Sequence, residues 1–130
     1  MAKRCQQFDI RNTIEQAMND AEINTLRRNI RENKGWVCHA LYCAIFGLLL
    51  AEKNYSFESI IETIITSGGD CDTTSCISGA LIGFYFGYSK LISSPQTFAN
   101  LNIIVNANWS AGDFPLDDFY HPKTLFPLLF

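Results

Sequence analysis

The sequence predicts an all-α protein, an orthogonal or multi-helix bundle that forms one domain over residues 1–130. Apolar residues recur at helical spacings as far as residue 89, and typical start and stop residues separate the helical segments. With 48% hydrophobic residues, the chain has enough apolar surface to bury a core. No stretch shows the alternation of strands and helices that a parallel sheet requires.

The first predicted helix covers residues 12–33. Its apolar residues recur at helical spacings: Ile14, Met18, Ala21, Ile23, Leu26 and Ile30. Asn33 and Gly35 follow the last turn, and such residues commonly stop a helix. The second predicted helix, residues 36–52, is apolar on nearly every side. This pattern is typical of the buried centre of a bundle.

The third predicted helix covers residues 56–66, with Ser56 as its cap. Its isoleucines form a narrow stripe: Ile60, Ile61, Ile64 and Ile65. Because β-branched residues also favour strands, a strand stays the alternative for this segment.

The fourth predicted helix covers residues 73–89 and carries a glycine at every fourth position: Gly79, Gly83 and Gly87. Each glycine inside a helix costs about 1 kcal/mol relative to alanine. We therefore expect a neighbouring helix or a ligand to approach this face closely. The opposite face is predicted to join the core: Ile77, Leu81, Phe84 and Tyr85.

Residues 96–130 are predicted to form an irregular C-terminal segment, because Pro95 interrupts the helical pattern. Within it, residues 100–108 fit either a short helix or a strand. Residues 113–122 are predicted to be an acidic, aromatic-rich loop, and the apolar residues 125–130 are predicted to dock on the domain.

The net charge of −3 argues against nucleic acid as a default partner. The charge is unevenly distributed, with +2 in residues 1–34 and −5 in residues 35–130. Arg27, Arg28, Arg31 and Lys34 cluster near the predicted end of the first helix, where cations favour the helix dipole. A solvated helix end is the favoured interpretation of this cluster, and a contact with phosphate is the alternative.

Targeting signals and cysteine usage predict a cytoplasmic protein without a membrane partner. The chain does not open on a signal-peptide pattern, and its apolar run, residues 37–51, is shorter than the roughly 18–20 residues of a membrane span. The five cysteines are odd in number and include no Cys-x-x-Cys pair, which favours reduced thiols over a disulfide scaffold.

The chemistry of the chain centres on two carboxylates and a hydroxyl at Asp70, Asp72 and Thr73. The glycine pair Gly68 and Gly69 permits an abrupt turn just before them. In an extended or irregular loop, residues i and i+2 point the same way, so both carboxylates are expected to converge. These hard oxygen ligands suit Mg²⁺, Mn²⁺ or Ca²⁺. The alternative is an ordinary helix start with Asp72 as a solvated N-cap.

The same segment resembles the C-terminal signature of the ADP-ribosylglycohydrolase family. That signature reads Gly-Gly-Asp-Thr-Asp-Thr and precedes a helix with regularly spaced glycines, and the matching residues here are Gly68-Gly69-Asp70-Cys71-Asp72-Thr73 followed by Gly79, Gly83 and Gly87. Upstream, Gly35-Trp36-Val37 is similar to a Gly-Tyr-Val helix start in the family. The resemblance covers about residues 35–88.

The resemblance implies a truncated form of an all-α glycohydrolase fold. It implies a hydrolase that cleaves the glycosidic bond of ADP-ribosyl groups on proteins, with a two-ion Mg²⁺ site and with ADP-ribosylated protein or ADP-ribose as its partner. Asp70, Asp72 and Thr73 would be metal ligands, and Gly68 and Gly69 would contact the substrate. Cys71 stands where the family usually has threonine.

The remaining ligands of the family lie in a Gly-Asp-x-x-Gly segment, a Glu and a Thr-x-Asp-Asp cluster, and this sequence has no such segment or cluster. The resemblance therefore implies weak or absent activity for the chain alone, or a second chain that completes the site. Asp113, Asp117 and Asp118 could supply substitute ligands, although a solvated loop is the favoured interpretation.

Two other functions remain open. One is a non-catalytic domain that binds a protein partner or ADP-ribose, in which four aromatic residues could stack on adenine: Trp36, Tyr42, Trp109 and Tyr120. In such a domain His39 and Cys43 could also bind zinc, although packing is the favoured role.

The other is a haloacid-dehalogenase-type phosphatase. Asp70 would then be the nucleophile, Asp72 the acid/base and Asp117 with Asp118 the metal pair. This function requires Asp70 to end a buried parallel strand.

Overall fold

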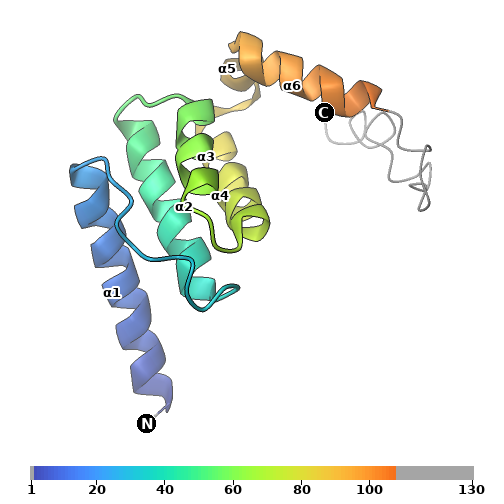
Figure 1. Ribbon diagram of the computed structural model, residues 1–130. Coiled ribbons are helices and arrows are strands. Elements are labelled where there is room, and N and C mark those ends of the chain that lie inside the picture. Colours follow the sequence, from blue (N-terminus) through green and yellow to red (C-terminus); the bar gives the residue numbers. More distant parts are fainter. Residues whose placement is uncertain (1, 108–130) are drawn as a thin grey trace, which may run out of the picture. The chain divides into compact units, whose positions relative to one another are not determined.

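The computed structural model describes the backbone of residues 2–107 and the side chains of residues 9–107. Its regular elements are α1 (Ala2–Glu22), α2 (Val37–Glu52), α3 (Phe57–Thr66), α4 (Cys71–Phe86), α5 (Tyr88–Ser93) and α6 (Pro95–Asn106) (Figure 1). No strand occurs among the described residues, which confirms the all-α prediction.

The chain divides into two compact units, Met1–Leu91 and Ile92–Phe130. Helices α1 to α4 belong to the first unit, and α6 belongs to the second. One domain over residues 1–130 therefore stays a prediction. Within the described residues, no helix has the length and apolar character needed to cross a membrane.

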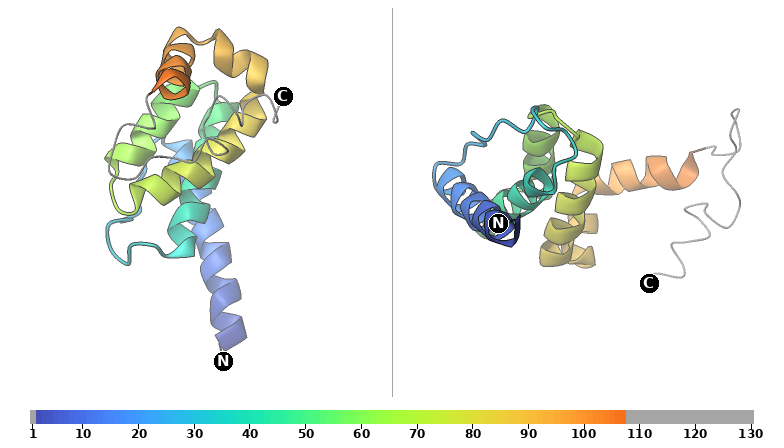
Figure 2. Two further views of the ribbon diagram at one scale, coloured as in Figure 1. Left: turned by 90° about the vertical axis from the view of Figure 1, so that its right-hand side faces the viewer. Right: turned by 90° about the horizontal axis from the view of Figure 1, so that it is seen from below.

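Helix α2 is the centre of the first unit and lies between α1 and the α3–α4 pair (Figure 2). Its residues Tyr42, Cys43 and Phe46 are completely buried, as the all-round apolar pattern predicted. Ile60, Ile64 and Ile82 complete this core from α3 and α4. The predicted buried central helix is confirmed.

The boundaries of α2 and α3 agree with the predicted helices 36–52 and 56–66. Trp36 is the N-cap residue of α2, and Ser56 is that of α3. The Ser56 hydroxyl accepts a hydrogen bond from the Ser59 N–H at 3.2 Å, which satisfies one of the free donors at the start of α3. The strand alternative for the isoleucine stripe is therefore wrong.

The predicted first helix, residues 12–33, is wrong at both ends, because α1 runs from Ala2 to Glu22. Its end is fixed by Asn24, which has a left-handed φ of 53°. The N–H groups of Asn24 and Thr25 donate to the carbonyls of Ala21 and Asp20, as in a helix C-terminal turn. Residues 23–36 then form a loop that is not helical. Ile30 lies in this loop and its side chain is buried. Its apolar spacing therefore indicated a buried residue and not a continued helix.

Asp20 holds this loop against α1 and α2. Its carboxylate accepts hydrogen bonds from the Arg27 side chain at 2.7 Å, the Arg27 backbone N–H at 3.0 Å and the Tyr42 hydroxyl at 2.5 Å. Burial raises the pKa of Asp20, but these hydrogen bonds outweigh burial and the net pKa is lowered. Burial and the hydrogen bond to Asp20 raise the pKa of Tyr42. Lys53 adds a cap, since its ammonium donates to the carbonyl of Ala21 at 2.8 Å.

Helix α4 ends three residues before its predicted limit, because Gly87 adopts a φ of 74°. Within the described residues, no neighbouring helix approaches the glycine row of α4 closely, so that part of the prediction is wrong, and the approach of a ligand stays a prediction. A Cβ at Gly79 or Gly83 would make ordinary contacts, 3.6 Å to Ile61 and 3.7 Å to Leu91. The tight contact lies at Gly47 of α2, where a Cβ would be 2.6 Å from the Ile82 side chain.

The second unit contains α6 where an irregular segment was predicted from residue 96. Ser94 caps this helix by accepting from the Thr97 N–H at 3.4 Å, and Pro95 occupies its first turn, where its missing N–H is not needed. The helix alternative for residues 100–108 is therefore confirmed as far as Asn106. The predictions for residues 113–122 and 125–130, and for Trp109, lie outside the described residues.

Substituting Gly47 tests the contact between α2 and α4. In Gly47→Ala the new methyl group meets the fully buried Ile82, and overpacking of this kind costs about 1–3 kcal/mol. The control Gly79→Ala adds a methyl group at an ordinary van der Waals distance from Ile61. Both glycines lie inside helices, so both substitutions gain about 1 kcal/mol of helix propensity and this gain cancels in the comparison. Urea unfolding should place Gly47→Ala well below Gly79→Ala in stability. Equal stability of the two variants would contradict the packing described here.

Substituting Tyr42 tests the Asp20 network. Tyr42→Phe removes a hydrogen bond to a buried carboxylate, which costs about 1.5–3 kcal/mol at pH 7. Because the folded-state pKa of Asp20 is lowered from 3.8, this stabilisation is complete above pH 3.8 and disappears as the pH falls through the lower value. Urea unfolding of wild type and Tyr42→Phe at several pH values measures the difference. Tyr55→Phe, at an exposed tyrosine, should show no such pH dependence. A penalty that stays constant into acid would contradict the role of Asp20.

Candidate functional site

The glycine pair between α3 and α4 forms a sharp left-handed turn, as the sequence predicted. Gly68 and Gly69 have φ values of 80° and 79°. A Cβ at Gly69 would overlap the carbonyl oxygen of Ile30, and one at Gly68 would lie 2.9 Å from Nε of Arg31. Both positions therefore require glycine for backbone conformation and for space. Contact of the two glycines with a substrate stays a prediction.

Arg31 ties this turn to the loop 23–36. Its Nε–H donates to the carbonyl of Ser67 at 3.0 Å. Together with the Ile30–Gly69 contact, this hydrogen bond fixes the turn from the side of the loop. Sequence reasoning had assigned Arg31 to a solvated helix end and missed this contact, since nothing local signals a partner 36 residues away.

The carboxyl groups of Asp70 and Asp72 come together at the start of α4. A hydrogen bond with Asp70 lowers the pKa of Asp72, and the backbone N–H groups of Thr73 and Asp72 lower it further. The convergence predicted for residues i and i+2 is therefore present. Asp72 and Thr73 are exposed, and Asp70 is half-buried.

The alternative of an ordinary helix start is correct in placing an exposed acid in the first turn of α4, but Asp72 is not the N-cap residue. Helix α4 begins at Cys71, so Asp70 occupies the N-cap position and Asp72 lies inside the first turn. The Asp70 side chain makes no capping hydrogen bond, while its backbone carbonyl accepts from the Thr74 N–H at 2.9 Å and the Thr74 hydroxyl at 2.6 Å. The Asp70 carboxylate is therefore left available to a ligand.

A cavity of about 180 Å³ lies beside Asp70. Its walls come from the end of the loop 23–36, from the start of α2 and from α4, and they include Gly35, Trp36, His39, Asp70, Thr73 and Ile77. Gly35 has a φ of 81°, and a Cβ there would lie 3.7 Å from an Asp70 carboxylate oxygen. From the sequence, Gly35 was interpreted only as a residue that stops a helix and as part of the segment Gly35-Trp36-Val37 that resembles the family.

His39 lines this cavity, but both of its ring nitrogens are occupied. Nδ1 accepts a hydrogen bond from Nε of Arg28 at 3.0 Å, so the ring proton lies on Nε2, which donates to the carbonyl of Glu32 at 2.8 Å. Cys43 is completely buried, and burial raises its pKa to about 12. The zinc alternative for this pair is therefore wrong, and packing is their role.

The donor types at Asp70, Asp72 and Thr73, two carboxylates and a hydroxyl, are chemically suited to one Mg²⁺ ion, and their role as its ligands stays a prediction. This ion commonly binds through one or two carboxylates and keeps several of its waters. Among the described side chains, no group of three or more His, Cys, Asp or Glu residues is arranged to hold a metal. The described residues thus do not supply the two-ion centre that the family resemblance implies.

The structure excludes two other expectations. Tyr42 is completely buried, so it cannot stack on adenine, whereas Trp36 is 39% exposed and lines the cavity. Asp70 follows a helix and a glycine turn, and it does not end a strand, so the phosphatase alternative lacks the framework its nucleophile needs.

The predicted core face of α4 is instead exposed. Ile77, Leu81, Phe84 and Tyr85 are 46%, 39%, 89% and 47% exposed, and the buried residues of α4 are Thr74, Ser78 and Ile82. The sequence pattern identified an apolar face correctly but could not reveal that the described part of the chain leaves it uncovered. This exposed face begins one turn after Asp72 and Thr73.

Comparison with protein families agrees with the geometry. The family model described as ADP-ribosylglycohydrolase matches residues 2–101, a longer stretch than the resemblance at residues 35–88 indicated. Searches of curated proteins and of solved structures gave no match. Members of this family use Mg²⁺ and act on ADP-ribosylated substrates. The chain belongs to the ADP-ribosylglycohydrolase family.

Proposed function

We propose that the chain is a hydrolase of the ADP-ribosylglycohydrolase type, which cleaves the glycosidic bond of ADP-ribosyl groups on proteins with the assistance of Mg²⁺. The observation that carries this proposal is the Asp70–Asp72 carboxyl pair beside the cavity of Trp36 and His39. Family membership supports the substrate class.

Asp70, Asp72 and Thr73 would hold the metal, since they offer two carboxylates and a hydroxyl at one helix start. When bound, Mg²⁺ supplies Lewis-acid and template chemistry for the hydroxyls of a ribose. The positive end of the α4 dipole favours anionic groups at this position.

The residues that line the cavity have different roles in this proposal. Trp36 and Ile77 offer partly exposed apolar surface against which a sugar or a base can pack, so they exclude water from one side of the ligand. His39 cannot accept a proton at Nδ1 without losing its hydrogen bond from Arg28. Among the described residues that line the cavity, Asp70 supplies the carboxylate, and its role in this proposal is to hold the metal beside the ligand.

A second candidate function is binding of ADP-ribose without turnover. It is favoured by the described side chains, which bring two carboxylates together but no third acidic or histidine ligand. A second chain that supplies further ligands is part of this proposal, and the exposed apolar face of α4 next to Asp72 supports it. Cys38, Cys43, Cys71 and Cys76 are all free thiols, which supports the proposed cytoplasmic location.

Calorimetric titration with Mg²⁺ tests the metal site. We expect about one ion per chain, because two carboxylates and several waters suffice for one Mg²⁺. Asp70→Asn and Asp72→Asn should each weaken binding by at least about tenfold, since loss even of an outer-shell partner costs about 10–100-fold. Glu62→Gln, at an exposed carboxylate of α3 outside the cavity, should bind Mg²⁺ like wild type. Equal Mg²⁺ affinity in all four proteins would contradict the assignment.

Release of ADP-ribose from an ADP-ribosylated protein tests catalysis. The wild-type chain with Mg²⁺ should release ADP-ribose, and Asp70→Asn should lower the rate by about 10–100-fold, as expected when a group that holds the metal is lost. Glu62→Gln serves again as the control. Mg²⁺-dependent binding of ADP-ribose without release would favour the second candidate function. Release that survives in Asp70→Asn would contradict both.

A further inference from the structure

A second cavity, of about 200 Å³, lies between α1 and the loop 23–36. It is lined by Gln16, Asn19, Asp20, Arg27 and Arg28. None of these residues lines the cavity beside Asp70. The sequence had singled out Arg27 and Arg28 as part of a basic cluster, with a phosphate contact as one alternative, and the proposed function makes no use of them.

The charges that line this cavity leave a positive excess. The two guanidinium groups face a single carboxylate, that of Asp20, which already accepts three hydrogen bonds from Arg27 and Tyr42. The other two lining residues are neutral amides. Asp20 therefore neutralises one cation and has little capacity left to neutralise the second.

Several hydrogen-bond donors of the two arginines are unused within the described part of the chain. Arg27 donates only through Nε and its backbone N–H, so both of its terminal nitrogens are free. Arg28 donates through Nε and Nη1, which leaves Nη2 free. The two arginines together therefore offer three free terminal NH₂ groups. A carboxylate has only two oxygens to accept from them, so a ligand with more acceptor oxygens fits these donors better.

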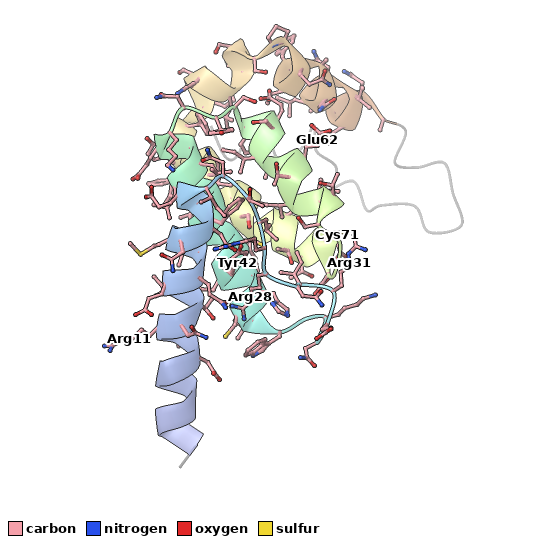
Figure 3. The ribbon with its side chains drawn as sticks, turned by 60° about the vertical axis from the view of Figure 1, so that its left-hand side comes forward. Arg11, Arg28, Arg31, Tyr42, Glu62 and Cys71 are labelled. Atoms are coloured by element: carbon pink, nitrogen blue, oxygen red, sulfur yellow. The ribbon has the colours of Figure 1, made fainter. Side chains whose placement is uncertain are left out.

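Arg28 is held rigidly in place. Its Nη1 donates to the Gln16 side-chain oxygen at 2.6 Å, and its Nε donates to His39 at 3.0 Å. Its guanidinium carbon lies 5.3 Å from the Trp36 ring centroid and 5.5 Å from that of Tyr42, and Figure 3 shows Arg28 next to Tyr42. A guanidinium fixed in this way loses little side-chain entropy when it binds an anion.

The end of α1 does not cancel this positive charge. A helix C-terminus carries a partial negative charge from its free carbonyls, which would disfavour an anion nearby. Here Lys53 donates to the carbonyls of Ala21 and Glu22, and the Asn24 and Thr25 N–H groups bind two carbonyls of the last turn. The last turn of α1 is therefore largely satisfied.

We propose that the cavity lined by Arg27 and Arg28 binds a phosphate group. Phosphate presents three oxygens to the three free terminal nitrogens, and the planar guanidinium fork matches phosphate geometry. This inference goes beyond the proposed function, because it requires neither Mg²⁺ nor the carboxyl pair. The phosphate comes either from the diphosphate of an ADP-ribosyl ligand or from a separate phosphate-bearing molecule.

Calorimetric titration with inorganic pyrophosphate in metal-free buffer tests this site. Gln16→Glu and Asn19→Asp each place a negative charge at the cavity wall and leave the Arg27–Asp20 pair in place. Each should weaken pyrophosphate binding by at least about tenfold, as expected when an interaction with a charged group is opposed. Arg11→Gln is the matched control, because it changes the net charge by the same amount on α1 and Arg11 does not line the cavity. Thermal unfolding should show that all variants remain folded.

A parallel titration with ADP-ribose in the presence of Mg²⁺ identifies the source of the phosphate. Weaker binding of both pyrophosphate and ADP-ribose in Gln16→Glu assigns the site to the diphosphate of an ADP-ribosyl ligand. Weaker binding of pyrophosphate alone assigns it to a separate ligand. Absence of pyrophosphate binding by wild type, or equal binding by wild type and both cavity variants, overturns the proposal. Asp70→Asn should leave pyrophosphate binding unchanged, so failure of the proposed function is recognised separately.

Discussion

The hydrogen bonds of the Asp20 carboxylate are the interaction on which the rest of the site depends. They join the end of α1 to Arg27 at the start of the loop and to Tyr42 in the centre of α2. The loop 23–36 contains no regular helix or strand, so its position depends on such contacts. Because Asp20 is 5% exposed, solvent does little to weaken them. Ile30, Arg31 and Gly35 of the same loop then lie beside the start of α4.

The carboxyl pair is thus held by a chain of contacts between two irregular segments. The carbonyl of Ile30 packs on Gly69, Arg31 donates to Ser67, and Gly35 lies against Asp70. Each glycine at this junction has a positive φ, so the turn combines a backbone conformation that other residues avoid with close packing. An arrangement with both constraints tolerates little displacement, which suits a site whose ligands must hold a small cation in a demanding geometry.

Local signals in the sequence were sufficient for α2, α3 and the acidic turn. Ser56 and the apolar periodicity define α3, and the glycine pair followed by Asp70 and Asp72 implies a turn with converging carboxylates whatever surrounds it. The end of α1 was missed although Asn24 is a local stop, because the apolar spacing continued to Ile30, which is buried from the loop. The contact of Lys53 with this helix end comes from some thirty residues away along the chain, and no local pattern indicates it.

Other features of the fold depend on which helix faces are in contact, and the sequence pattern alone does not predict these contacts. Gly79 and Gly83 recur at a regular spacing in α4, yet the tight contact between α2 and α4 lies at Gly47, which belongs to no regular glycine pattern. The apolar face at Ile77 and Phe84 was recognisable, but apolar character does not tell whether the same chain covers it. The cavity of Arg27 and Arg28 was likewise hidden, because a helix was predicted where a loop brings both arginines against α1.

The exposed face of α4 has a consequence for the strength of the proposed metal site. Asp72 and Thr73 lie at the end of this face, in full contact with water, where the dielectric constant is high and the attraction between a carboxylate and a cation is weak. A surface that covered Ile77 and also extended over the preceding turn would remove water from around the carboxyl pair. The attraction then increases severalfold, because it varies inversely with the local dielectric constant. Affinity for a divalent cation and burial of this hydrophobic strip are therefore thermodynamically linked, and each favours the other.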